Sequence, residues 1–314
     1  MKEFLRRLLG GVILLSALGM AATKAPDRPL ETLVARWAPP PSQFVELDGQ
    51  LVHLRDEGPR TDPTPLLLIH GTSASLHTWE GWARQLSRTR RVVSVDLPGF
   101  GLTGPSATDD YSTPAYVDFI QRLMRHLDLP PAIVAGNSLG GEIAWLLAAR
   151  HPQQVKALVL IDAGGFEFEP EELPLGFRLA RMPGVRQLTR YFLPRAAVTQ
   201  SLQSVYGDPS KVRSELVDRY FELTLREGNR EALIRRFEQL NLGAYLPELA
   251  RVKQPTLILW GGRDRLIPPR WGDAFVQALP GSRLVRLDAL GHVPQEEDPA
   301  ATLAALEPWL KALP

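Results

Sequence analysis

Short, largely apolar runs alternate with stretches of helical periodicity along most of this chain. The runs lack a regular exchange of polar and apolar positions, which indicates strands buried on both faces. They lie at residues 65–69, 91–96, 133–136, 157–162, 256–260 and 283–287. Helical patterns separate them, among others at residues 78–86, 113–127, 269–279 and 299–313. Strands that alternate with helices predict a parallel sheet covered by helices on both faces.

The helix predicted at 113–127 begins with a recognisable pair of residues. Thr113 has a side-chain oxygen that can accept a hydrogen bond from the first turn. Pro114 suits the first helical position, because its φ is already helical and the N–H it lacks would be unpaired there. We therefore expect Thr113 to be the N-cap and Pro114 the first residue of the helix.

Two more strands precede the parallel part. Residues 44–47 and 51–55 flank Asp48-Gly49, and Asp-Gly between two apolar runs predicts a two-residue hairpin turn. With this hairpin the sequence predicts an α/β fold with a mostly parallel sheet of eight strands. Helices should cover both faces of that sheet.

The alternation of strands and helices stops near Gly164 and resumes at about residue 251. Residues 165–250 contain no convincing strand, but they hold helical patterns at 210–226 and 229–241, interrupted by prolines. We expect this stretch to be a helical cap inserted after the sixth strand. The core of the fold should then consist of residues 44–164 and 251–314.

The first 22 residues differ from the rest of the chain. Basic residues at the start, Lys2, Arg6 and Arg7, are followed by an uncharged apolar stretch over 8–22. About 15 apolar residues suit a secretory signal and are short for a spanning helix, which needs about 20. The segment is therefore interpreted as a signal peptide or an uncleaved signal-anchor. Residues 23–43 should be a linker with one short helix.

This interpretation predicts that the catalytic part works outside the cytoplasm. The protein would be exported to the periplasm or the medium, or tethered to a membrane through residues 1–22. The full chain of 314 residues has 36 basic and 35 acidic residues, a formal net charge of +1, and no long block of like charge. Such a balance does not favour nucleic acid as a partner. The chain has no cysteine, which excludes disulfides and a thiolate nucleophile.

Ser138 carries the strongest sign of chemistry. It lies in the pattern Gly136-Asn137-Ser138-Leu139-Gly140, between an apolar strand and a helix. A G-x-S-x-G pattern occurs by chance in roughly one chain of this length in ten, so the pentapeptide alone is weak evidence. The strand before it and the helix after it match a nucleophile elbow, in which a sharp turn exposes the serine hydroxyl. We therefore predict that Ser138 is a nucleophile.

A nucleophilic serine needs a base and a carboxylate that orients the base. His292 follows the last strand and Asp264 follows the strand before it, so both should lie at the edge of the sheet where the serine projects. The order Ser138, Asp264, His292 is the order of such triads on α/β folds. Asp162, which ends another strand, is the alternative acid.

The oxyanion formed during attack needs two hydrogen-bond donors. Leu139 should supply one through its backbone N–H at the helix N-terminus. Thr72, in the loop after the third strand, should supply the other, with Ser73 as the alternative. His70 should shape this loop, and Asp96 should bond a turn. The remaining histidines, at positions 53, 77, 126 and 151, are interpreted as structural.

Residues 44–312 resemble the α/β-hydrolase superfamily. The resemblance is carried by the following motifs: His70-Gly71-Thr72, Asp96-Leu97-Pro98-Gly99-Phe100-Gly101, Gly136-Asn137-Ser138-Leu139-Gly140, Gly261-Gly262-Arg263-Asp264 and Gly291-His292-Val293-Pro294-Gln295-Glu296. It is strongest to the lidded subgroup of small-molecule esterases, haloperoxidase-like enzymes and C–C hydrolases. The resemblance implies a cap domain over the site. Ser138 distinguishes the chain from superfamily members with Asp at this position, and its oxyanion loop lacks the Gly-Pro-Gly usual in C–C hydrolases.

These observations predict a serine hydrolase of the carboxylic ester class (EC 3.1.1). Its substrate would be a small apolar ester, cleaved through an acyl-enzyme intermediate without a metal or organic cofactor. Activity should fall in acid as the base takes up a proton, near pH 6.5 for an ordinary histidine. The alternatives are a C–C hydrolase or a perhydrolase related to haloperoxidases on the same triad, and a binding protein that does not turn its ligand over. The oligomeric state is left open.

Overall fold

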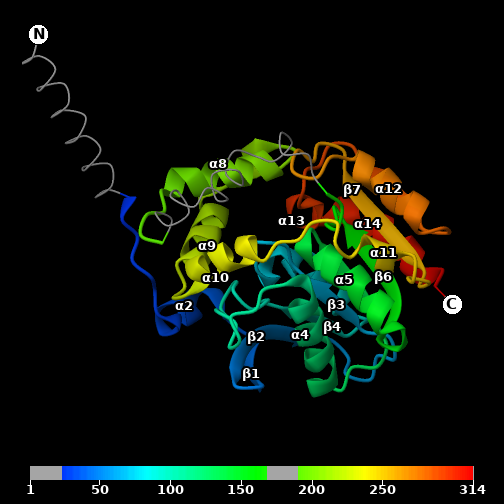
Figure 1. The fold of residues 1–314 in the computed structure, drawn as a ribbon, viewed down its shortest axis with the longest axis horizontal. Helices are drawn as coiled ribbons and strands as arrows, with labels where there is room; N and C mark the ends of the chain where they lie inside the picture. Colours follow the sequence, from blue (N-terminus) through cyan, green and yellow to red (C-terminus); the bar gives the residue numbers. More distant parts are fainter. Residues whose placement is uncertain (1–22, 168–189, 314) are drawn as a thin grey trace, which may run out of the picture.

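The computed structural model describes residues 23–167 and 190–313. Eight strands form one sheet in the order β1-β2-β4-β3-β5-β6-β7-β8 (Figure 1). The strands are β1 (Ser42–Leu47), β2 (Gln50–Glu57), β3 (Leu66–Ile69), β4 (Val92–Val95), β5 (Ala132–Asn137), β6 (Val155–Ile161), β7 (Thr256–Gly261) and β8 (Arg283–Leu287). The hairpin β1–β2 and the pair β2–β4 are antiparallel, and β3 to β8 run parallel. The predicted α/β fold with a mostly parallel eight-stranded sheet is confirmed.

Two apolar layers sandwich the sheet, because successive residues of a strand face opposite sides. Leu67 and Val134 pack with the helices α4 (Thr113–His126), α5 (Leu139–Arg150) and α12 (Arg270–Ala278). Leu68 and Ile133 face the other side, where α3 (Glu80–Leu86) and α14 (Pro299–Lys311) cover them. Both faces of the central strands are therefore dry, which explains why their sequence is apolar without alternation.

The N-terminus of α4 differs from the prediction in one residue. The N-cap is Ser112, whose side-chain oxygen accepts a hydrogen bond from the N–H of Ala115 at 3.3 Å. Ser112 has the extended backbone (φ −66°, ψ 155°) that an N-cap needs, whereas Thr113 is already helical and buried. The prediction that Thr113 caps this helix was wrong, because both residues carry a hydroxyl and the sequence pattern does not distinguish them.

The described part of the chain between β6 and β7 is helical. It contains α8 (Arg195–Val205), a 3₁₀ turn at Pro209–Lys211, α9 (Ser214–Thr224), α10 (Asn229–Glu238) and α11 (Leu246–Leu249). A single helix was expected over 210–226, but an extended residue, Arg213, separates the 3₁₀ turn from α9. Residues 168–189 of the expected cap lie outside the described residues. We refer to residues 190–250 as the insertion.

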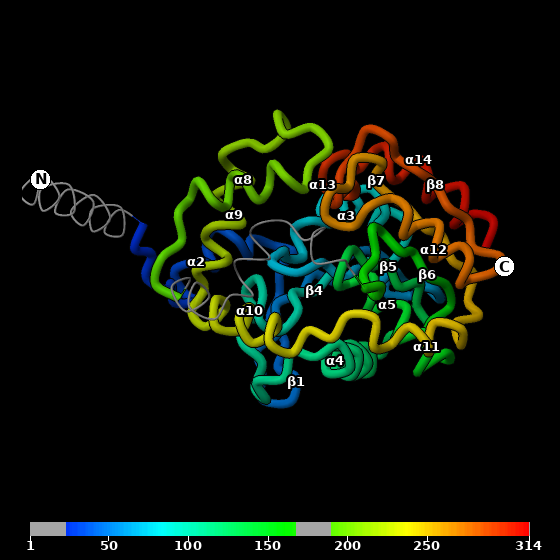
Figure 2. Tube along the Cα trace, turned by 45° about the horizontal axis from the view of Figure 1, so that its top comes forward, coloured from blue at the N-terminus to red at the C-terminus, as the bar shows by residue number. Residues whose placement is uncertain are grey.

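The segment that follows residue 22 packs against the insertion. In Figures 1 and 2, α2 (Leu30–Trp37) lies beside α9 at one end of the molecule. Arg36 donates hydrogen bonds to Asp218 and Glu222 of α9, and the indole N–H of Trp37 donates to Glu222 at 2.7 Å. The expected short helix in 23–43 is thus a part of the folded body.

The predicted signal segment, residues 1–22, lies outside the described residues. Among residues 23–167 and 190–313, no helix has the length and apolar character that a membrane crossing requires.

The N-cap of α4 can be tested directly. Ser112→Ala should lower the free energy of unfolding by about 1 kcal/mol, because the N–H of Ala115 loses its acceptor. Ser112→Asp keeps an acceptor at the same place and should match the wild type in a urea titration. Equal stabilities of the two variants would contradict the assignment.

Candidate functional site

Ser138 lies at the apex of the turn between β5 and α5, with φ 55° and ψ −118°. A positive φ is costly for a residue with a side chain, so the surroundings must enforce it. The flanking glycines make the turn sterically feasible. A Cβ on Gly136 would lie 2.0 Å from the carbonyl oxygen of Gly140, and a Cβ on Gly140 would lie 2.1 Å from that of Ile69. The strand, the turn and the helix are therefore in backbone contact.

The loop after β3 lies against this serine. A Cβ built on Gly71 would come within 3.0 Å of the Cβ of Ser138, which places Thr72 next to the contact. His70 fixes the loop: its Nδ1 donates to the carbonyl of Gly71 at 2.7 Å, and its Nε2 accepts from the N–H of Leu97 at 3.0 Å. Burial lowers the pKa of His70, which keeps the ring neutral, as these two bonds require.

Leu139 is the first residue of α5. The N–H groups in the first turn of an α-helix have no carbonyl partner within the helix, and the helix dipole favours negative charge there. The backbone N–H groups proposed from the sequence, those of Leu139 and Thr72, thus belong to two segments that converge on Ser138. Whether both donate to one oxyanion stays a prediction.

His292 and Asp264 are in direct contact. His292 Nδ1 donates to Asp264 Oδ2 at 2.7 Å, and both side chains are buried. The other oxygen of Asp264 accepts from the N–H groups of Leu266 and Ile267 at 2.7 and 2.9 Å, which fixes the carboxylate. A neutral imidazole that donates from Nδ1 has its lone pair on Nε2, where it can take a proton.

Asn137 joins the histidine to the serine turn. Its Nδ2 donates to the carbonyl of His292 at 2.9 Å and to that of Ile161 at 3.1 Å. The residue before Ser138 therefore ties the end of β5 to the His292 loop. No role for Asn137 was expected from its sequence, although it occupies the second position of the pentapeptide.

Asp162, the alternative acid, is fully buried beside this pair. One oxygen of each carboxyl and a ring nitrogen of His292 lie within 4.8 Å of one another. Asp162 Oδ1 accepts from the N–H of Gly261 at 2.9 Å. Burial first, and then the charge of Asp264 and a hydrogen bond to it, raise the pKa of Asp162 well above its usual value. Two adjacent buried carboxyls cannot both ionise cheaply, and the raised pKa favours the protonated form of Asp162.

The same three residues are the group with metal-ligand geometry among those described, and they are all buried. A metal bound through Nδ1 of His292 and Oδ2 of Asp264 would have to replace the proton between them. Those two atoms are already joined by a hydrogen bond of 2.7 Å. The arrangement suits an oriented base better than a metal centre.

Asp96 organises the neighbouring loops. Its Oδ1 accepts from the N–H of Leu76, and its Oδ2 accepts from the N–H of Leu102 and from His53 Nδ1. Burial would raise the pKa of Asp96, but its interactions with His53, followed by those with His70 and His77, outweigh burial and hold this pKa well below its usual range. Asp96 is thus an ionised structural carboxylate.

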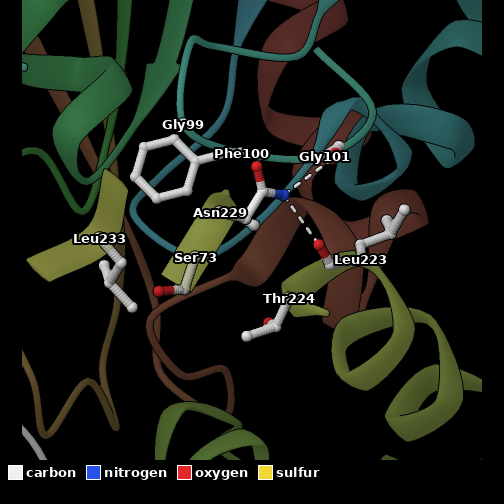
Figure 3. A pocket seen from close by; sticks show the side chains of 9 residues that line it. Ser73, Gly99, Phe100, Gly101, Leu223, Thr224, Asn229 and Leu233 are labelled. Carbon is white, nitrogen blue, oxygen red and sulfur yellow. Dashed lines mark hydrogen bonds between the residues drawn. The ribbon is translucent and has the colours of Figure 1, made fainter. Parts of the chain in front are cut away.

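A small pocket of about 20 Å³ opens between the loop after β3 and the insertion (Figure 3). Ser73, Phe100, Leu233 and Asn229 are among the residues that line it. Asn229 of α10 donates from Nδ2 to the carbonyls of Gly101 and Leu223, as the dashed lines show. The pocket therefore lies between the loops that follow β3 and β4 and the insertion, and its lining is mainly apolar.

Comparisons with known proteins identify the family of this chain. A family model described as "alpha/beta hydrolase fold" matches residues 64–299. The chain belongs to the α/β-hydrolase family.

Several individual proteins are similar to this chain. The 2-hydroxymuconate semialdehyde hydrolase of Pseudomonas sp. strain CF600 is 27% identical over 251 residues, which cover 77% of this chain and 84% of that protein. A crystal structure of a putative lipase from Acinetobacter baumannii AYE has a TM-score of 0.75 and 26% identity, covering 91% of this chain and 97% of that one. A crystal structure described as a membrane phospholipase A has a TM-score of 0.73 and 28% identity, covering 100% and 99%. Hydrolase activity is supported by these relatives, which include both ester and C–C hydrolases.

The proton on Asp162 predicts a pH-dependent stability difference. In the unfolded chain Asp162 should ionise near pH 4, whereas the folded protein keeps it protonated. Folding then binds a proton above that pH, so the wild type loses stability as pH rises. Asp162→Asn has no titrating group at this position. Its free energy of unfolding, relative to that of the wild type, should therefore rise with pH by up to about 1.4 kcal/mol per pH unit.

Urea unfolding between about pH 4 and pH 8 measures this difference. Asp273→Asn, an exposed carboxylate paired with Arg286, is the control and should follow the pH slope of the wild type. The same slope for Asp162→Asn would show that Asp162 is ionised in the folded state.

Proposed function

We propose that this protein is a serine hydrolase of carboxylic esters, with Ser138 as nucleophile, His292 as base and Asp264 as its orienting acid. The observation that carries the proposal is the bonded pair of His292 and Asp264, tied through Asn137 to the strained turn of Ser138. Nothing in this arrangement requires a metal or an organic cofactor.

In the proposed reaction, His292 Nε2 takes the hydroxyl proton as Ser138 Oγ attacks the ester carbonyl. The backbone N–H groups of Leu139 and Thr72 stabilise the negative oxygen. The tetrahedral intermediate collapses, His292 gives its proton to the leaving alcohol, and an acyl-enzyme remains. Water then attacks this ester with His292 again as base, which releases the acid and restores Ser138.

The ester class is favoured by two of the similar structures. The putative lipase and the membrane phospholipase A, at 26% and 28% identity, carry ester-cleaving names. We propose an ester with an apolar acyl chain as the substrate, since both of these names denote enzymes that act on lipid esters. The second candidate is C–C hydrolysis on the same residues, because a 2-hydroxymuconate semialdehyde hydrolase is 27% identical over most of the chain.

Ser138→Ala should lower the hydrolysis rate of p-nitrophenyl esters by about a thousandfold or more, because it removes the nucleophile. Ser106→Ala, at a partly buried loop serine whose hydroxyl bonds Thr108, is the matched control and should keep wild-type activity. A fluorophosphonate should add its mass to the wild type and not to Ser138→Ala. Equal ester turnover by the wild type and by Ser138→Ala would refute the assignment of Ser138 as nucleophile.

A panel of substrates, tested with the same proteins, distinguishes the two candidate functions. Esters of graded acyl length and a vinylogous diketone should separate the two candidates. We expect turnover of the esters, with a preference for one range of acyl length, and little turnover of the diketone. The opposite ranking would favour the C–C hydrolase.

We also propose that the protein is exported, on the basis of the basic and apolar residues 1–22. The full chain should appear outside the cytoplasm on cell fractionation, while a chain that starts at Thr23 should stay inside. The N-terminal mass of the exported protein then distinguishes a cleaved signal from a retained anchor. Cytoplasmic recovery of both forms would refute export.

A further inference from the structure

The loop that carries His292 is bonded to the insertion rather than to the core alone. The N–H of His292 donates to the carbonyl of Val205, at the end of α8, at 2.7 Å. The backbones meet so closely that side chains do not fit between them. A Cβ on Gly291 would lie 2.3 Å from the Val205 oxygen, and a Cβ on Gly207 would lie 2.3 Å from the carbonyl oxygen of Ala289.

One buried carboxylate bridges these two backbones. Glu297 ends α13 (Pro294–Glu297), the short helix that follows His292. Its Oε2 accepts from the N–H of Gly291 at 2.8 Å and from that of Gly207 at 2.9 Å, and its Oε1 accepts from the N–H of Asp208 at 2.9 Å. Glu297 thus binds the residue before His292 and two residues of the insertion at once.

We propose that Glu297 positions His292, by holding the His292 loop and the insertion in one fixed arrangement. The proposal rests on the proposed role of His292 as base. Hydrogen bonds from N–H groups to a carboxylate are stronger than those between neutral groups. Three of them on Glu297 therefore hold Gly291, Gly207 and Asp208 in a fixed arrangement around one side chain. A base displaced by even about 1 Å from the serine loses much of its efficiency.

The neighbouring Glu296 supplies a matched control. Its carboxylate accepts from the hydroxyls of Tyr206 at 3.0 Å and Tyr220 at 2.8 Å, and it pairs with Arg219. These partners are all side chains of the insertion. Changing Glu296 therefore loosens the insertion from the same short helix, while the bonds of Glu297 to backbone N–H groups remain.

The test compares Glu297→Gln and Glu297→Ala with Glu296→Gln in the full chain. Glutamine keeps one acceptor oxygen and turns an amide NH₂ toward a backbone N–H, whereas alanine removes both acceptors. We expect kcat for a p-nitrophenyl ester to fall by about tenfold in Glu297→Gln and further in Glu297→Ala, with little change in KM. Glu296→Gln should alter KM more than kcat.

A second measurement does not depend on turnover. The proton that His292 Nδ1 shares with Asp264 should give a far-downfield proton resonance, recorded without substrate. This resonance should shift or broaden in Glu297→Gln and stay in place in Glu296→Gln. Failure of ester turnover in the wild type would overturn the proposed function, yet the resonance would still report on the positioning by Glu297.

Wild-type kcat and an unchanged resonance in a folded Glu297→Gln would overturn the proposal. The same losses in Glu296→Gln as in Glu297→Gln would also overturn it, because a general loosening of the insertion would then account for both. Should Glu297→Ala fail to fold, Glu297→Gln decides the matter alone.

Discussion

The close crossing of β3, β5 and the start of α5 is the constraint on which the rest of the site depends. Backbone atoms of Gly140 approach those of Gly136 and Ile69 so closely that a side chain at either glycine would collide with a carbonyl. This contact holds Ser138 at a φ of 55°. A residue held in such a conformation is fixed by its surroundings, so its hydroxyl projects in a defined direction before any substrate arrives.

Around this turn, buried polar groups are arranged so that each charge has a defined partner. Asp264 is bonded to His292, while the pKa of its buried neighbour Asp162 is raised, which favours the protonated form of Asp162. Asp96 is ionised among backbone donors and His53, and His70 is neutral between Gly71 and Leu97. In surroundings of low polarity an unpaired buried charge is costly, so these hydrogen bonds help to hold the loops in place.

The insertion is joined to the core by buried polar contacts near the same turn. Glu142, in the first turn of α5, has its pKa raised by burial to about 7, and Arg236 of α10 lies 4.0 Å from it. Asn229 of the insertion donates to the core carbonyl of Gly101, and Glu297 of the core accepts from the N–H groups of Gly207 and Asp208 in the insertion. Movements of the insertion therefore bear on the elements that carry the serine and the histidine.

Much of the fold and the position of the candidate site could be predicted from local patterns. The apolar runs placed the strands, the Asp48-Gly49 turn placed the hairpin, and the pentapeptide around Ser138 marked the turn between β5 and α5. These predictions were correct because hydrophobic periodicity and the need for glycine in a tight turn depend on residues close together in the chain. The break at Arg213 and the cap of α4 were missed, because several nearby residues satisfy the same pattern and tertiary packing selects one of them.

The sequence by itself determined the α/β fold and the residues whose chemistry suits a nucleophile, a base and an acid. Only the tertiary structure decided which of Asp162 and Asp264 bonds His292, since both end a strand at the same edge of the sheet. It also placed Glu297 between the His292 loop and the insertion. The reason is physical: a hydrogen bond depends on distances of about 3 Å between segments far apart in the chain, and no local pattern encodes them.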